Sequence, residues 1–331
     1  MSHKKDTDYL AISTRVHAME NRMLSRERMD RMIDAKDDGE ALKVLSECGY
    51  GGEGLTLSNV EAALAAAGQE TFRDLLSSVP DPKVVQVFQL RYDYHNAKAL
   101  VKAQAVGKDA RHLLMSGGRY APQKLAECFE KEDGRDLSPV FRAALEQARD
   151  TLAATRDPQL SDLVLDRACY QEMAQLAKET GSRFLEGYVA LSVDVANLRA
   201  AVRVARMGKG SEFLTQVLLP GGNVSPRTLA SARGEDLAAL FQAGALAQAA
   251  QLGAAATQDR GHSLTAFERE CDNALKHYVD GARRVPFGEQ AVIGYLYAKE
   301  AELTAIRTIL SGRMAGLDAD TIRERLREAY V

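Results

Sequence analysis

Apolar residues recur at steps of three and four along most of the chain, which is the spacing that places them on one face of an α-helix. In the stretch 87–107 this stripe consists of Val87, Leu90, Tyr94, Ala97 and Val101. Ala, Leu, Arg and Glu dominate the composition and aromatic residues make up only 6% of it, which favours closely packed helices. The sequence therefore predicts an all-α protein. Helices are expected over 9–24, 88–107, 160–178, 184–207, 237–256, 263–278 and 287–310, with shorter ones between them.

Polar residues inside two of the long helices repeat at an interval of 101 residues. Each copy has an acidic residue followed, fourteen positions later, by a glycine that ends the helix. A fixed period of this kind indicates one structural unit used several times. The matched residues are Asp93, Asn96, Lys98, Lys102 and Gly107 in the first copy, Asp194, Asn197, Arg199, Arg203 and Gly208 in the second, and Glu302, Ala305, Arg307 and Gly316 in a looser third copy.

The segment after the long helix repeats as well. Residues 114–126 return as 218–230, each with a Gly-Gly pair and a proline that starts the next helix. We therefore expect three similar helical domains, at residues 1–110, 111–218 and 219–331. The helix at 9–24 is interpreted as an incomplete further copy, which would place the beginning of the chain in the first domain.

Asp93 and Asn96 lie three positions apart and share one helix face, so both can serve the same neighbour. One interpretation is a catalytic pair, and the other is a structural pair that hydrogen-bonds an adjacent helix. The recurrence of the pair in the second copy favours the structural interpretation, because an active site is rarely repeated along one chain. Lys98 and Lys102 lie four apart on another face, where we expect solvent exposure.

Other candidate chemistry is sparse. His95, beside Asp93 and Asn96, is the best single catalytic candidate, although its spacing fits packing equally well. Asp34, Asp37 and Asp38 form the densest acidic cluster, which suggests either a divalent metal or a solvated helix end, and the helix end is favoured. The glycine run at 49–54 formally matches GxGxxG, but a helix is expected before it instead of a strand, which predicts a loop. We predict no catalytic, cofactor-binding or metal-binding residues.

Charge and hydropathy exclude further classes of protein. The net charge of −3 is spread over interspersed residues of both signs, which argues against nucleic-acid binding. No run of eighteen apolar residues occurs, and the polar start lacks the apolar core of a signal peptide, so a cytoplasmic protein is expected. Free thiols are expected at Cys48, Cys128, Cys169 and Cys271, which lie far apart in the sequence.

The carboxyl-terminal run at 285–317, followed by 322–330, closely resembles the C subunit of prokaryotic V/A-type ATPases, the relative of the eukaryotic d subunit. Segments 15–24, 92–100 and 194–199 match the same family. The likeness covers nearly the whole length. One departure is the pair Thr304 and Ala305, where a more polar pair including Asn is expected, and it puts the polar contact of the third copy in question.

The resemblance implies an all-helical funnel of three similar domains about a pseudo-threefold axis. It also implies a non-catalytic central-stalk subunit of the rotor, a socket that joins the D and F subunits of the shaft to the membrane ring of proteolipid subunits and transmits torque. Such a protein has no cofactor and lies on the cytoplasmic face, held at the membrane through its protein partners. The repeats alone would equally allow a free-standing helical scaffold for another protein. An enzyme is a third alternative, which a bound metal or nucleotide would favour.

Overall fold

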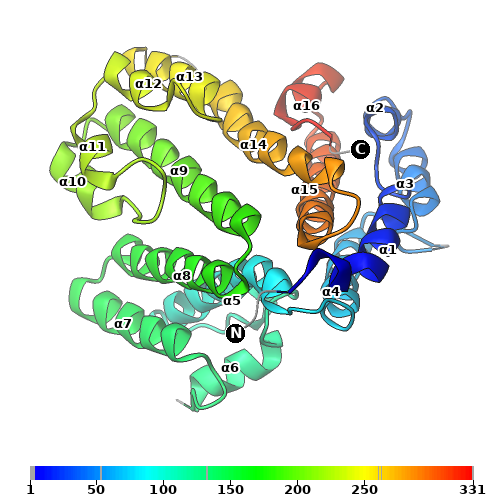
Figure 1. Ribbon diagram of the computed structural model, residues 1–331, viewed down its shortest axis with the longest axis horizontal. Coiled ribbons are helices and arrows are strands. Elements are labelled where there is room, and N and C mark those ends of the chain that lie inside the picture. The colour runs from blue at the N-terminus through cyan, green and yellow to red at the C-terminus, as the bar shows by residue number, and fades with distance from the viewer. Residues whose placement is uncertain (1–3, 53, 132, 260, 262, 330–331) are drawn as a thin grey trace. The chain divides into compact units, whose positions relative to one another are not determined.

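The computed structural model describes residues 4–52, 54–131, 133–259, 261 and 263–329. The regular elements of these residues are helices, which confirms the predicted all-α class (Figure 1). In chain order they are η1 (Asp6–Tyr9), α1 (Leu10–Glu20), α2 (Arg26–Ile33), α3 (Asp38–Glu47), α4 (Val60–Leu76), α5 (Lys83–Ala105), η2 (Arg111–Leu113), α6 (Pro122–Glu130), α7 (Pro139–Thr155), α8 (Pro158–Thr180), α9 (Arg183–Arg206), α10 (Ser211–Val217), α11 (Pro226–Ser231), α12 (Glu235–Phe241), α13 (Ala247–Gln258), α14 (Thr265–Val279), η3 (Asp280–Arg284), α15 (Glu289–Met314) and α16 (Ala319–Arg325).

The chain divides into two compact units. Unit 1 comprises residues 69–189, and unit 2 comprises residues 4–68 together with 190–329. The boundaries fall inside α4 and α9. Unit 2 therefore combines the beginning of the chain with its end, while the division into three domains at 1–110, 111–218 and 219–331 stays a prediction.

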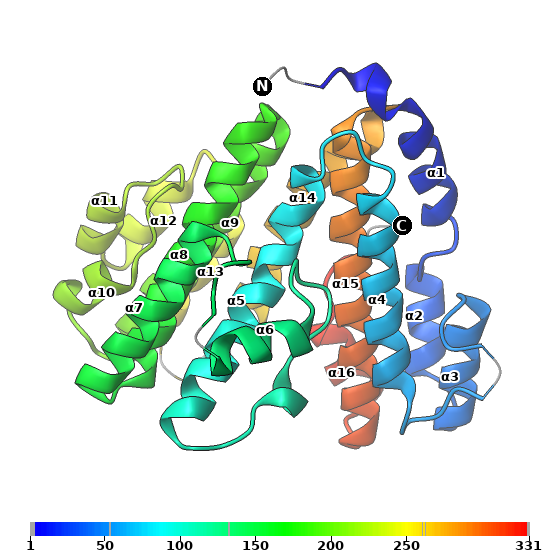
Figure 2. The ribbon, with the colours of Figure 1, turned by 90° about the horizontal axis from the view of Figure 1, so that it is seen from below.

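In unit 1, α8 packs against both α5 and α7 (Figure 2). The five residues of the predicted stripe on α5 are all buried, which confirms the face assigned from their spacing. Aromatic rings connect the helices: Phe88 stacks on Tyr188 with ring centroids 5.3 Å apart, and Tyr94 meets Phe141 edge to face at 4.9 Å. These contacts fix α5 in the core of the unit.

In unit 2, α9 shares a buried cluster with α10 to α14. Gly253 on α13 allows close approach, since a Cβ atom there would lie 2.7 Å from a methyl group of Val202. The single helix predicted over 237–256 is wrong, because the chain turns between α12 and α13. The turn places both Phe241 and Leu246 in the core and leaves the residues between them exposed.

The remaining core of unit 2 joins α15 to the beginning of the chain. Leu303, Ile306 and Ile309 of α15 are buried in one cluster with residues of α2 and α3, and α1 also packs on α15. Residues 9–24, which we expected to contribute to the first domain, thus contact the last long helix. α16 ends at Arg325.

Several helices begin or end at residues that favour that position. Ser25 caps α2 by accepting a hydrogen bond from the backbone N–H of Arg28, and Asp318 caps α16 in the same way through Thr321. Gly181 ends α8 with a backbone φ of 72°, a conformation that glycine adopts without strain.

Candidate functional site

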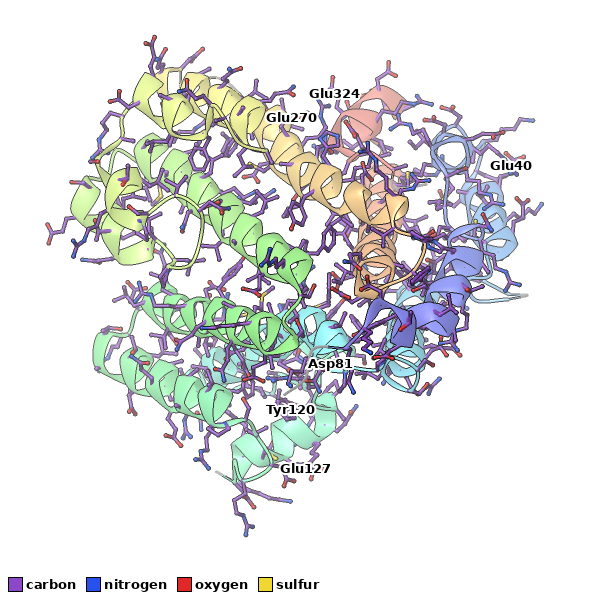
Figure 3. All side chains as sticks on the ribbon, in the orientation of Figure 1. Glu40, Asp81, Tyr120, Glu127, Glu270 and Glu324 are labelled. Carbon is purple, nitrogen blue, oxygen red and sulfur yellow. The ribbon has the colours of Figure 1, made fainter. Side chains whose placement is uncertain are left out.

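The repeated acid and amide of α5 hold the loop that follows this helix. The Asp93 carboxylate is fully buried and accepts hydrogen bonds from Arg119 Nε at 2.7 Å and from the backbone N–H of Tyr120 at 3.3 Å. Asn96 binds both backbone groups of Met115, donating to the carbonyl at 2.9 Å and accepting from the N–H at 2.7 Å. The predicted structural pair is present, but its predicted partner is wrong: it binds a loop, which includes Tyr120 (Figure 3), instead of a helix. We call this arrangement the acid–loop contact.

The second copy forms the same contact from α9. Asp194 accepts hydrogen bonds from the backbone N–H groups of Asn223 at 3.0 Å and Val224 at 3.1 Å, and from the Asn223 side chain at 2.8 Å. Asn197 donates to the carbonyl of Leu219 at 2.8 Å and accepts from its N–H at 2.7 Å. The repeat in the sequence therefore corresponds to a repeated set of buried hydrogen bonds.

The third copy completes its contact with residues from the beginning of the chain. Glu302 on α15 is buried and accepts a hydrogen bond from the backbone N–H of Leu24 at 2.6 Å. Its other oxygen accepts from the Tyr50 hydroxyl at 2.6 Å and from the Lys299 ammonium at 2.8 Å. The acid contact thus persists, whereas Ala305 has no side-chain amide to bind a loop. The departure at Thr304 and Ala305 put the polar contact of the third copy in question. The part made by the acid is kept, and only the part made by the amide is lost.

The three copies agree in one further detail. In each, the acid accepts the backbone N–H of the residue immediately before the N-cap of the next short helix. These pairs are Tyr120 before Ala121 of α6, Val224 before Ser225 of α11, and Leu24 before Ser25 of α2. The loop of the third copy therefore comes from about 280 residues earlier in the chain, a distance that a search for a fixed period does not cover.

Two glycines make the first two contacts possible. A Cβ atom on Gly118 would overlap Asp93 Oδ1, and one on Gly222 would overlap Asp194 Oδ1. The second glycine of the repeated Gly-Gly pair is therefore needed for close approach of the loop to the acid.

Lys98 and Lys102 do not have the solvated position expected of them. Lys98 pairs with Asp166 of α8 at 2.6 Å, and Lys102 pairs with Asp162 of α8 at 3.0 Å. Both lysine side chains are half-buried. The expectation failed because their partners lie on a helix about sixty or more positions away, which the spacing on α5 does not show.

The matching arginines of α9 form equivalent pairs with α14. Arg199 binds Asp272 at 2.8 Å and Arg203 binds Glu268 at 2.7 Å. In the third copy Arg307 binds Glu61 of α4 at 2.7 Å. Each long helix is therefore joined to a neighbouring helix through the basic residues that follow its acid.

The first acid–loop contact belongs to a buried group with two carboxylates. Glu172 of α8 accepts hydrogen bonds from Arg119 at 2.8 Å, from the Tyr94 hydroxyl at 2.9 Å and from Ser138 Oγ at 2.8 Å. Burial raises the pKa of Asp93 to about 6, although the Arg119 guanidinium opposes the shift. Because these oxygens are occupied by protein donors, the arrangement is suited to holding helices together and not to binding a substrate.

The other candidate residues lie apart from this group. His95 is exposed, whereas Asp93 and Asn96 point into the core, so the three do not converge. Of the acidic cluster, Asp34 pairs with Arg323 at 2.6 Å, and Asp37 caps α3 through the N–H of Glu40 at 2.8 Å. Asp38 pairs with Arg313 at 3.2 Å. Among the described residues no group of three His, Cys, Asp or Glu side chains could hold a metal ion.

The glycine run at 49–54 lies between α3 and α4. Gly49, Gly51, Gly52 and Gly54 all have positive φ, which suits a loop that ends a helix. A dinucleotide fingerprint requires a strand before the glycines, but the helix α3 precedes them. The predicted loop is therefore confirmed.

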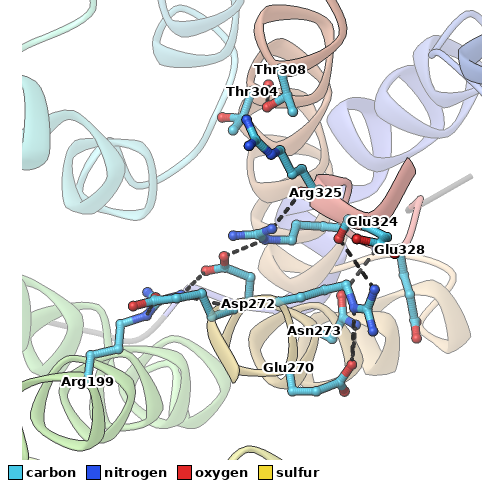
Figure 4. A network of polar contacts seen from close by, with 12 residues as sticks. Arg199, Glu270, Asp272, Asn273, Thr304, Thr308, Glu324, Arg325 and Glu328 are labelled. Carbon is cyan, nitrogen blue, oxygen red and sulfur yellow. Dashed lines mark hydrogen bonds and ion pairs between the residues drawn. The ribbon is translucent and has the colours of Figure 1, made fainter. Parts of the chain in front are cut away.

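A polar network on α14 was missed by the sequence analysis. Asp272 accepts hydrogen bonds from Arg199 of α9 and from Arg327, at 2.8 and 2.7 Å (Figure 4). The next residue, Asn273, accepts from the backbone N–H of Glu328 at 3.2 Å. α14 thus binds the segment after α16 as well as α9. The acidic partners also repeat, since Asp162 and Asp166 of α8 return as Glu268 and Asp272 of α14 at an interval of 106 residues, and this interval is the sequence signal that could have found them.

The sequence matches known proteins over almost its entire length. Residues 12–325 match the model of the family described as ATP synthase (C/AC39) subunit. The chain is 23% identical to the C subunit of the V-type sodium ATPase of Enterococcus hirae, over 98% of this chain and 99% of that protein. It is 25% identical to the C subunit of the V-type ATP synthase of Thermus thermophilus, over 96% and 98% of the two chains. The C subunit of the A-type ATP synthase of Methanocaldococcus jannaschii is 24% identical over 96% of this chain and 86% of its own.

Proposed function

The chain belongs to the ATP synthase (C/AC39) subunit family, and from this premise we propose that it is the non-catalytic socket of the rotor in a rotary V/A-type ATPase. In this role it joins the D and F subunits of the shaft to the membrane ring of proteolipid subunits, on the cytoplasmic face, and transmits torque between them. The observation that supports the proposal most is the match to the family over residues 12–325, almost the entire chain.

The repeated contacts suit a part that transmits torque. A torque coupler must resist deformation, and each acid–loop contact fixes a connecting segment to a long helix through buried hydrogen bonds. Buried polar groups that are fully hydrogen-bonded make a structure stiff, because moving the loop would leave several of them without a partner. Three such contacts and the interhelical ion pairs provide this stiffness without any reactive group.

The ends of the long helices offer surfaces for partners. Val106 and Met207 occupy matched positions just before the glycines that end α5 and α9, and their side chains are 66% and 56% exposed. Met314, at the end of α15, is 66% exposed. Exposed large apolar side chains at three matched helix ends are consistent with protein contacts there.

Within the described residues, no helix has both the length and the apolar character that crossing a bilayer requires.

A pull-down tests the proposed function. The chain is tagged in its native host, membranes are solubilised in mild detergent, and the proteins recovered with it are identified. Recovery of ring and shaft proteins together supports the socket. Recovery of another protein without them would favour the alternative of a free-standing helical scaffold and would contradict the proposal.

A functional measurement complements the pull-down. In membranes from a strain that lacks the chain, ATP-driven ion transport should be lost while the detached catalytic head still hydrolyses ATP. Adding back the purified chain should restore transport. Unchanged ion transport without the chain would refute a role in coupling.

A further inference from the structure

Unit 1 has an apolar groove between the end of α5, η2 and the end of α7. Its volume is about 1250 Å³, above the roughly 300–1000 Å³ of common small-molecule sites. Val106 and Leu113 lie on its surface and are 66% and 53% exposed. The apolar residues that line it include Ala99, Ala103, Val106, Leu113, Leu152 and Ala153.

Comparison with the second repeat explains why the groove of the first repeat is uncovered. Six residues separate Lys108 from Met115, whereas nine separate the matched Lys209 from Leu219. The longer segment forms α10, a helix of seven residues that buries Leu214. The shorter segment forms only the three-residue turn η2, which buries none of its side chains.

The matched positions on the long helices differ in exposure accordingly. Val204 of α9 is 6% exposed and belongs to a cluster that includes Leu214, with Phe213 and Val217 of α10 packed against it. Its counterpart on α5, Ala103, is half-buried and lines the groove. In the second repeat the helix α10 covers this position, whereas the described part of the first repeat has no helix that covers it.

We propose that this groove binds an amphipathic helix of about two turns, supplied by another protein of the rotary complex. The apolar face of that helix would present residues such as the Phe, Leu and Val of α10. Seven residues of α-helix are about 10 Å long, and binding of an amphipathic helix in an apolar groove is a common mode of recognition. The proposal rests on the proposed function, which supplies the complex.

The rim of the groove adds electrostatic selectivity. Glu146 and Asp150 lie four positions apart on α7 and are exposed, while Lys108 and Arg156 follow the ends of α5 and α7. A partner helix is favoured if it places a basic side chain opposite Glu146 and Asp150 and an acidic one near Lys108 or Arg156.

Two matched variants test the groove. Ala153 and Ala154 are both exposed on α7, but only Ala153 lines the groove. Ala153→Trp should fill the groove and weaken binding of the purified chain to ring-containing membranes from a strain that lacks this protein, mixed with the detached shaft and head, by about tenfold or more. Ala154→Trp should bind within about twofold of wild type. Unchanged helicity and melting temperature would show that both variants fold.

The outcomes separate the two proposals. If the wild-type chain binds and Ala153→Trp binds equally well, the groove is not a docking site, although the socket role stands. If the wild-type chain itself does not bind ring and shaft, the socket role fails and the docking proposal falls with it.

Crosslinking identifies the occupant. A benzoylphenylalanine introduced at Leu113 in the assembled complex should crosslink, on illumination, to a helical segment of another protein with an apolar face. Crosslinks only to lipid, only to this chain, or to nothing in a complex that contains ring and shaft would overturn the proposal.

Discussion

At the scale of single residues, Gly222 is required by the carboxylate beside it. A Cβ atom there would overlap Asp194 Oδ1, so Gly222→Ala should displace the loop and lower the free energy of unfolding by about 1–3 kcal/mol. Gly210 is the control, because a Cβ atom there would meet nothing within 4 Å. Gly210→Ala should cost at most about 1 kcal/mol, because the change only weakens the N-cap of α10. Urea denaturation measures both, and equal effects would contradict the role given to the acid–loop contact.

Asp93 should contribute a distinct pH dependence. Burial raises its pKa to about 6 in the folded protein, above the value of about 3.9 in the unfolded chain. The folded state therefore binds more protons between these values, and this group's contribution to stability is largest below pH 4 and falls as the pH rises to about 6. The fall should be on the order of 3 kcal/mol.

Asp93→Asn removes the titration and tests this sign. Its stability between pH 4 and 6 should fall less steeply than that of the wild type, because the amide has no proton to lose in this range. Urea titrations at several pH values give both slopes. If the free energy of unfolding changed equally steeply with pH in the variant and the wild type, Asp93 would not titrate in this range.

At the scale of elements, Asn197 should keep the segment after α9 in place. Its side chain satisfies both backbone groups of Leu219, and Asn197→Ala would leave two buried polar groups without a partner. We expect a loss of about 2–4 kcal/mol. Hydrogen exchange at the Leu219 amide should accelerate more than exchange in the middle of α9. Uniform acceleration across the unit would indicate that the amide does not act locally.

The sequence predicts elements better than it predicts their partners. The long helices and the repeated acid and amide are visible because periodicity and fixed offsets are local properties of the chain. The binding of Asn96 to Met115, and of Lys98 to Asp166, is not visible, because each depends on how distant segments meet. The break between α12 and α13 was missed for a related reason: the apolar run satisfies helical spacing, and only burial of Leu246 requires the turn.

At the scale of the whole molecule, the third copy connects the two ends of the chain. The family resemblance implied three similar domains, and the acid of each long helix was matched correctly from the sequence. The loop that binds the third acid was not identified from the sequence, because Leu24 lies at the opposite end of the chain from Glu302. A repeat search compares segments in order, so it does not detect a copy whose parts are separated by the other copies.

Glu302 should therefore control the stability of unit 2 as a whole. Glu302→Leu leaves the buried Leu24 N–H and Tyr50 hydroxyl without their acceptor and the Lys299 ammonium without its anionic partner, which should cost about 3–5 kcal/mol. α1 and α15 belong to unit 2, whereas α5 and α8 belong to unit 1. Hydrogen exchange should therefore accelerate in peptides from α1 and α15 before it accelerates in peptides from α5 and α8. Thr304→Ala, an exposed change on the same helix, should leave both pairs unaffected. Equal acceleration of all four helices would instead mean that the two units unfold as one, and that the junction of the chain ends stabilises the entire protein.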